Sequence, residues 1–246
     1  MHTQYLSDGA DLAQWGYLLT TDGAWGSPPV RGANLAMPHR PGQVWEQKVA
    51  DQAVLNLIFG VLDQIPGGGT VTDPVAQHLA NMQAFRAALW KTTATRTLTR
   101  NLTLPSGVQT TTGAFELASL QSQRLGVSAR QVTVALTLLD GYLYGATVDK
   151  TVTGSQTISV LGDASTVKMT IDLPGAGTLT NSTLGISVTV SALTTLDVLA
   201  FTSTAGIGLV TAHTGDDFWM RLQPGNNAMV WSGSGAATLH VNEAYL

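Results

Sequence analysis

The stretch "FWMRLQPGNNAMVWSGSGAATLHVNEAYL", residues 218–246, decides the fold of the second half of the chain. Apolar and polar residues alternate on both sides of a Pro-Gly turn and of a Gly-Ser-Gly turn, which is the pattern of half-buried antiparallel strands. The stretch contains no catalytic motif. We therefore expect strands that complete a sheet, and a function that depends on shape and surface more than on a pocket.

The same pattern extends upstream to Gly145 as a series of short segments separated by Gly, Pro, Asn and Asp. We expect strands at "QTISVLG" (156–162), "TVKMTIDL" (166–173), "LGISVTVSAL" (184–193), "LDVLAFTS" (196–203), "IGLVTAH" (207–213), "DFWMRL" (217–222), "NAMVWSG" (227–233) and "ATLHVNEAY" (237–245). Strands this short and this closely spaced predict an antiparallel β-sandwich, which we place at residues 148–246.

The first half, residues 1–147, is predicted to be a separate domain that contains one clear helix. In "DPVAQHLANMQAFRAALWKTT" (73–93), Asp73 can cap and Pro74 suits the first turn. The expected core-facing stripe consists of Val75, Leu79, Met82, Phe85 and Leu89. The glycines of "IPGGGTVT" (65–72) form a loop, since no Gly-Lys-Ser/Thr follows to make a phosphate cradle.

Two further elements are expected before residue 147. The segment "AFELASLQSQRLG" (114–126) can form a second, weaker helix that ends at Gly126. The segment "RQVTVALTLLDGYLYG" (130–145) alternates as a strand does, with Asp140-Gly141 as a turn signal.

The chain carries little charge for its 246 residues. Charged residues make up 11%, against roughly 25% in average soluble domains, and such surfaces are common in proteins that live in assemblies. Residues 1–150 hold ten basic and ten acidic residues, so the net charge of −4 belongs to residues 151–246, which hold two basic and six acidic residues. Stable binding of nucleic acid by the second half is therefore not expected. There is no cysteine, which excludes disulfides, thiolate zinc sites and a cysteine nucleophile.

No catalytic or metal-binding motif is recognisable, and we expect no enzyme activity and no cofactor. The five histidines lack metal-ligand spacing, and "WSGSGA" has the wrong spacing for a nucleophile elbow. His213 with Asp216 and Asp217 could hold a cation, although the segment also has the composition of a polar turn. Trp219 and Trp231 could stack on a sugar, but aromatic residues that alternate in strands are more often core residues.

One stretch of the first half is dense in residues that fix turns or bridge carbonyls, "WGSPPVRGANLAMPHRPGQVWEQK" (25–48). An ordinary strand-loop-strand with solvated arginines would also account for it. The residues concerned are Arg31, Gly32, Asn34, Pro38, Arg40 and Gly42.

The spacing Arg-Gly-x-Asn-x-x-x-Pro-x-Arg-x-Gly at 31–42, the apolar strand at 54–62, the helix at 74–90 and "LTR" at 98–100 together resemble the distal tail proteins of long, flexible-tailed bacteriophages. The version found in phages of actinobacteria, often labelled minor tail protein, looks closest. "ALTLLDGYLYG" and the closing "LQPGNNAMVWSGSGAATLHVNEAYL" also resemble that family, so the likeness covers nearly the whole chain.

The resemblance implies a mainly β protein with an N-terminal split β-barrel, related to tail-tube proteins, and a C-terminal galectin-like sandwich. Six copies would form a ring around the DNA channel at the tail tip, with the six residues of the 25–48 segment as candidates for ring contacts. The implied partners are other copies of the chain, the tail tube protein, the tape measure protein and a tip hub or receptor-binding protein, with DNA only in transit.

The alternative from another class is a carbohydrate-binding module or adhesin that uses Trp219, Trp231 and a loop acid, Asp216 or Asp217. The N-terminal sequence shows no basic region followed by an apolar one, so we expect no signal peptide. The longest apolar runs are about half of what a bilayer requires, so no membrane partner is expected. The expected location is the virion tail tip, after assembly in the host cytoplasm.

Overall fold

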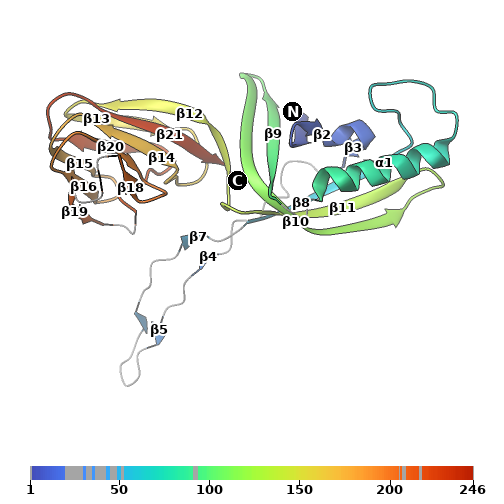
Figure 1. The fold of residues 1–246 in the computed structure, drawn as a ribbon, viewed down its shortest axis with the longest axis horizontal. Coiled ribbons are helices and arrows are strands. Elements are labelled where there is room, and N and C mark those ends of the chain that lie inside the picture. The colour runs from blue at the N-terminus through green and yellow to red at the C-terminus, as the bar shows by residue number, and fades with distance from the viewer. Residues whose placement is uncertain are drawn as a thin grey trace. The chain divides into compact units, whose positions relative to one another are not determined.

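The computed structural model describes residues 2–19, 30–31, 35–36, 43–44, 49–50, 53–90, 94–204, 206, 209–215 and 218–245. These residues form antiparallel sheets and one α-helix, so the expected mainly β class is confirmed (Figure 1). The described strands form no closed barrel. The chain divides between Leu143 and Tyr144 into two compact units, which are taken in turn below.

The first unit contains short strands near its start and four long ones. The strands are β1 (His2–Ser7), β2 (Ala10–Asp11), β3 (Gly16–Leu18), β4 (Val30–Arg31), β5 (Leu35–Ala36), β6 (Gln43–Val44), β7 (Val49–Ala50), β8 (Ala53–Val61), β9 (Arg96–Leu104), β10 (Gly107–Arg124) and β11 (Arg130–Leu138). A 3-10 helix, η1 (Leu12–Trp15), and the helix α1 (Pro74–Leu89) complete it.

A sheet in the order β10-β11-β8-β3 lies under α1, and every neighbouring pair in it is antiparallel. Alternate residues of β8 and β11 point toward the helix and are fully buried, so this face of the sheet forms the core. The helix contributes Phe85 and Leu89, and Phe85 meets the edge of the Phe59 ring with centroids 5.1 Å apart. Figure 1 shows α1 along these strands.

In the segment expected to form a second helix at 114–126, residues 114–124 are part of β10 instead, so that prediction was wrong. β10 is an 18-residue strand. Its first half pairs with β9, from Gly107 opposite Leu104 to Phe115 opposite Arg96, and its second half pairs with β11, from Phe115 opposite Leu138. The local helix preference of "AFELASLQSQRLG" is overridden by this pairing, because the ladder satisfies the backbone and buries Phe115.

The helix α1 begins as expected, but its buried stripe is not the expected one. The Asp73 carboxylate accepts hydrogen bonds from the backbone N–H groups of Val75 and Ala76. Phe85 and Leu89 are buried and Met82 is half-buried, whereas Leu79 is 53% exposed and Val75 is 43% exposed. The side of the helix against the sheet is completed by two polar residues, His78 and Asn81.

Asn81 explains why a polar residue occupies the buried face. Its side-chain amide donates to the carbonyl oxygens of Leu62 (2.8 Å) and Gln64 (2.6 Å), in the loop that follows β8. The Gln64 amide in turn donates to the carbonyls of Ala13 and Gln14 in η1. Two side-chain amides therefore join α1, the loop after β8 and η1, and they satisfy carbonyls that would otherwise be costly to bury.

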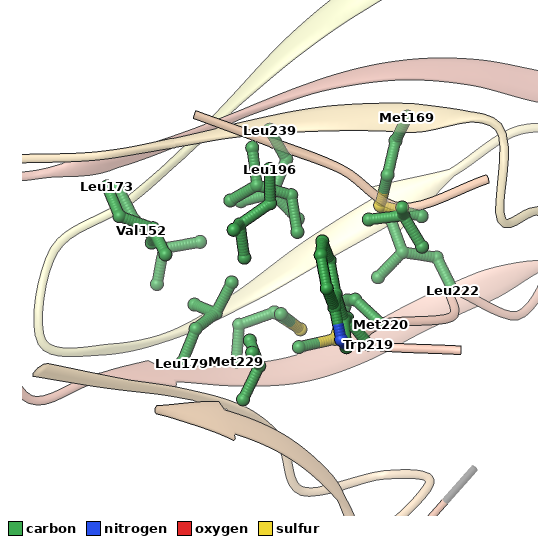
Figure 2. Packing of buried hydrophobic residues seen from close by; sticks show 14 of the residues in the cluster. Val152, Met169, Leu173, Leu179, Leu196, Trp219, Met220, Leu222, Met229 and Leu239 are labelled. Carbon is green, nitrogen blue, oxygen red and sulfur yellow. The ribbon is translucent and has the colours of Figure 1, made fainter. Parts of the chain in front are cut away.

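The second unit is a β-sandwich, as expected. Its strands are β12 (Leu143–Val152), β13 (Ser155–Val160), β14 (Met169–Leu173), β15 (Gly177–Asn181), β16 (Ile186–Val190), β17 (Thr194–Asp197), β18 (Thr202–Ser203), β19 (Val210–Thr214), β20 (Gly225–Trp231) and β21 (Ala237–Tyr245). One sheet has the order β18-β17-β14-β21-β12 and the other β13-β20-β15-β16-β19. Apolar side chains from both sheets form one core, in which Trp219 lies among methionine and leucine side chains (Figure 2).

Three details of the sandwich differ from expectation. "LDVLAFTS" (196–203) is not one strand, because β17 ends at Asp197 and β18 begins at Thr202. In the segment "DFWMRL", residues 218–222 do not form a strand: Leu222 forms a bridge to Thr166, and Trp219 and Met220 enter the core from irregular backbone. β15, which was not expected, pairs with β16 and β20. The turn after Leu222 is held by Asn227, whose carboxamide accepts from the Gln223 N–H and donates to the Gln223 carbonyl.

Replacing Leu89 or Leu79 by alanine tests the burial of α1. Leu89 is 1% exposed, so Leu89→Ala should lower the free energy of unfolding of the first unit by about 2–5 kcal/mol. Leu79 is 53% exposed, so Leu79→Ala should change it by less than about 0.5 kcal/mol. Urea unfolding of the dissociated chain measures both, and equal losses would show that the expected stripe is the buried one after all.

Candidate functional site

The face of the first unit's sheet that points away from α1 is polar and accessible. Directly paired residues lie on the same side of a sheet, so the pairing registers define this face. We call it the polar face; it consists of Tyr17, Val54, Asn56, Ile58, Glu116, Ser119, Gln121, Gln123, Gln131, Thr133, Ala135 and Thr137. The Tyr17 ring lies over Gly60, where any side chain would crowd it.

The polar face carries almost no charge. Glu116 is its one ionisable carboxylate, and none of the residues on the face is Lys or Arg. Arg124 and Arg130, at the ends of their strands, belong to the opposite side by the same alternation, and the Arg130 guanidinium donates to the Ser122 hydroxyl there. Amides, hydroxyls and a few apolar side chains without cations lack the Lys and Arg contacts that dominate the binding of nucleic-acid phosphates.

Two nested pairs of short strands occur in the part of the chain where ring contacts were expected. β4 pairs with β7, with Val30 opposite Ala50, and β5 pairs with β6, with Leu35 opposite Val44. β5 and β6 lie between β4 and β7 in the sequence, and each pair forms a two-stranded sheet of its own. Arg31 lies in β4. The other candidates lie outside the described residues: Gly32, Asn34, Pro38, Arg40 and Gly42.

The tryptophans considered for sugar binding are core residues. Trp219 is 6% exposed and Trp231 is 2% exposed, and both belong to the core of the sandwich. Neither ring has a free face for stacking, which disfavours a sugar site at these positions. Asp216 and Asp217 lie outside the described residues, and the nearby His213 ring forms a hydrogen bond between Nε2 and the Phe218 carbonyl (2.8 Å).

Sequence reasoning missed a row of polar side chains across the outside of the sandwich. His240 on β21 lies between two carboxylates, with Nδ1 2.6 Å from Asp149 on β12 and Nε2 3.0 Å from Asp172 on β14. The Thr195 hydroxyl on β17 donates to Asp172. The four residues are far apart in the sequence, so no local motif could have revealed them.

The carboxylates set the charge of this row. Hydrogen bonds to Asp172 and then to Asp149 raise the pKa of His240 above its ordinary value, against the opposing effect of partial burial. The hydroxyl of Thr195 and then the His240 ring lower the pKa of Asp172. A protonated ring can donate to both carboxylates at once, so the row joins three neighbouring strands.

Chemistry beyond this row is sparse in the part of the chain that the structure describes. No group of three His, Asp or Glu side chains there could hold a metal ion. No helix there is long and apolar enough to cross a membrane.

Comparison with solved structures shows that the fold is similar to that of a phage protein. The chain superposes on the Dit protein (gp 19.1) of phage SPP1 with a TM-score of 0.65 and 17% identity, over 100% of both chains. That protein is described as a paradigm of the hub adsorption apparatus of phages that infect Gram-positive bacteria. A chain of the phage P2 baseplate in its activated conformation with Ca aligns over 98% of both chains with a TM-score of 0.41 and 10% identity.

No protein-family model matches the sequence, and no curated protein matches it. The likeness to SPP1 Dit covers both units, so the chain has the Dit fold that the sequence resemblance implied. The link to phages of actinobacteria remains a prediction.

The His240 row predicts how the stability of the sandwich depends on pH. Because the pKa of His240 is raised by folding, its contribution is fully present below about pH 6.5 and is lost as the pH rises through the folded pKa. Asp172 contributes in the opposite sense, and its contribution is lost as the pH falls through its lowered pKa. His240→Gln should flatten the first dependence in thermal unfolding scans, and Asp149→Asn should reduce it. An unchanged pH profile in His240→Gln would contradict the assignment.

Proposed function

We propose that the protein forms a ring-shaped hub at the distal end of a phage tail, where it joins the tail tube to the adsorption apparatus and surrounds the path of the DNA. The observation that carries the proposal is the match to SPP1 Dit over the full length of both chains, since one shared domain could reflect a common fold alone. In this role the protein is structural and not an enzyme.

The polar face supports a position around DNA. DNA must pass through a hub without being held, and each Lys or Arg that contacts phosphate adds affinity that depends on salt. The polar face offers amides, hydroxyls and one carboxylate and no cation. It is the described surface of the first unit best suited to line a channel.

The remaining partners follow from the position of a hub. Copies of the chain form the ring, and the 25–48 segment, with Arg31 and Arg40, contributes contacts between copies. The segment contains the paired strands β4–β7 and β5–β6, whose backbone can take part in contacts between copies. The tail tube protein, the tape measure protein and a tip or receptor-binding protein are the proposed neighbours along the tail.

The sandwich is proposed as a structural domain rather than as an adhesin. The burial of Trp219 and Trp231 removes the two aromatic residues that a sugar site would have used. A galectin-like fold does not bring galectin function with it.

The ring is tested by mass. Six copies of a 25.8 kDa chain, 6 × 25.8, give about 155 kDa, and heterologous contacts that close by rotation produce one discrete species. Light scattering across micromolar concentrations, alone and with the tail tube protein added, should show that species. A monomer under both conditions would overturn the proposal.

The channel is tested by adding charge to the polar face. Gln121 and Thr133 are directly paired on that face, so the double substitution Gln121→Lys and Thr133→Lys would place two cations per copy toward the DNA. We expect the assembled ring to gain duplex DNA binding that weakens steeply with salt, while the unchanged protein does not bind at physiological salt. Fluorescence anisotropy of a labelled duplex measures both.

The matched control for this experiment is Ala80→Lys, which adds a cation to the exposed side of α1. It should leave DNA binding as weak as in the unchanged protein. Equal gains from both sites would mean that DNA responds to total charge and not to the polar face.

A further inference from the structure

The N-terminal half of α1, residues 74–81, is held against the rest of the first unit without a single buried apolar side chain. Among its residues only His78 and Asn81 are buried. The C-terminal half is held differently, because Phe85 and Leu89 lie in the hydrophobic core. Burial of apolar surface is the main source of packing stability, so the two halves of the helix differ in how firmly they are anchored.

His78 is an anchor that works only in its neutral form. Its side chain is 3% exposed, and neither ring nitrogen has a hydrogen-bond partner. The nearby Leu62 carbonyl accepts from the Asn81 amide and is not in hydrogen-bonding geometry with the ring. A neutral imidazole without partners costs a moderate desolvation penalty, whereas a protonated ring would bring an unpaired charge into the same place. The docked helix therefore requires a neutral ring.

The charged groups around His78 do not compensate for its burial. Burial is the main cause that lowers the pKa of His78, opposed by the Leu62 carbonyl. The Arg130 guanidinium at the start of β11 lowers the pKa further, and the Asp63 carboxylate in the loop after β8 raises it. β8 and η1, which also pack against α1, contain no ionisable residue. On α1 itself the other ionisable residue is Arg86, about two turns further along.

A glycine segment precedes the weakly anchored half. Gly67, Gly68 and Gly69 have φ angles of +83°, +93° and +136°, and residues 66–70 are exposed. Glycine adopts such angles without steric cost, so the backbone can change direction here without strain. The Asp73 carboxylate caps α1 through the helix's own N–H groups and would move together with it. The start of the helix and its cap can therefore turn about the glycines as one piece.

We propose that residues 70–81 form an acid-released flap: protonation of His78 detaches the N-terminal half of α1 from β8 and η1, and Gly67–Gly69 act as the hinge. The C-terminal half stays in the core. Release also breaks the two hydrogen bonds of the Asn81 amide to the loop after β8, and water replaces them. The flap is docked at neutral pH and opens in acid. It is a property of the single chain and does not depend on the proposed hub.

The direction of the pH dependence follows from the site. Because the ring takes up a proton on release, the docked state loses stability as the pH falls below about 6.5, the ordinary pKa of histidine, toward the lowered pKa of docked His78. Uptake of one proton changes the open fraction by at most about tenfold per pH unit. His240 in the sandwich acts in the opposite sense, since its pKa is raised by folding.

Amide hydrogen exchange tests the flap in the protein as it is purified. Between about pH 7 and about pH 5, after correction for intrinsic exchange, the protection of the amides of residues 78–82 should fall several-fold, by at most about tenfold per pH unit. The amides of residues 85–89 should keep their protection. His78→Leu removes the titrating group and should abolish the loss. His78→Gln, which does not titrate either, gives the same comparison if the leucine variant does not fold.

His240→Gln is the matched control, because it removes a histidine of the other unit, and residues 78–82 should respond to acid in it as in the unchanged protein. Exchange of the histidine C2 hydrogen measures the pKa of His78 without any variant and should place it below the ordinary value. A pKa at or above that value, or equal loss of protection in His78→Leu and the unchanged protein, would overturn the flap. Equal loss in residues 78–82 and 85–89 would also overturn it, since the helix would then open as one. The hub is tested separately, by mass.

Discussion

β10 pairs with β9 on one edge through its first half and with β11 on the other edge through its second half, and Phe115 is the residue at which the two pairings meet. The four-stranded sheet under α1, its polar face and its open edge all follow from this change of partner. A strand that kept β9 along its whole length would have a covered edge. The architecture of the first unit therefore rests on backbone hydrogen bonds between residues that are distant in the sequence.

The features that depend on local sequence were predicted correctly. Asp73 and Pro74 mark the start of α1, and Asp140-Gly141 marks the turn between β11 and β12, with Gly141 in the left-handed region at φ +73°. The features that depend on pairing between distant strands were not predicted correctly. Residues 114–124 have the composition of a helix but become a strand, and Leu79 fits a helical stripe but points out of the core. The polar face could not be found from the sequence, because its members are brought together by three strand registers.

Low charge on the first unit's sheet has a structural cost as well as a functional use. Natural sheets often protect an open edge with Lys or Pro, and "LASLQSQ" on β10 has neither. The same lack of cations leaves the polar face without the Lys and Arg contacts that nucleic-acid phosphates require. In the second unit the charges are placed differently, with Asp149, His240 and Asp172 joined across neighbouring strands. The first unit also has such a contact, between Arg96 on β9 and Asp8, so what lacks cations is its polar face and not the unit as a whole.

β21 (Ala237–Tyr245) is the last of the described strands in the sequence. It nevertheless lies in the interior of its sheet, between β14 and β12. The carboxylate of Glu243 on this strand accepts a hydrogen bond from the Leu161 N–H and lies 3.5 Å from the Lys150 ammonium. β21 therefore also holds Leu161 and Lys150, which are synthesised much earlier, in their places. During synthesis the sandwich cannot assemble until the residues of β21 have left the ribosome. The described strands β1–β11 of the first unit all precede residue 144, so they are synthesised before β21. Translation thus imposes an order on the two units, since the second sheet partners of β14 and β12 become available only when β21 has been made.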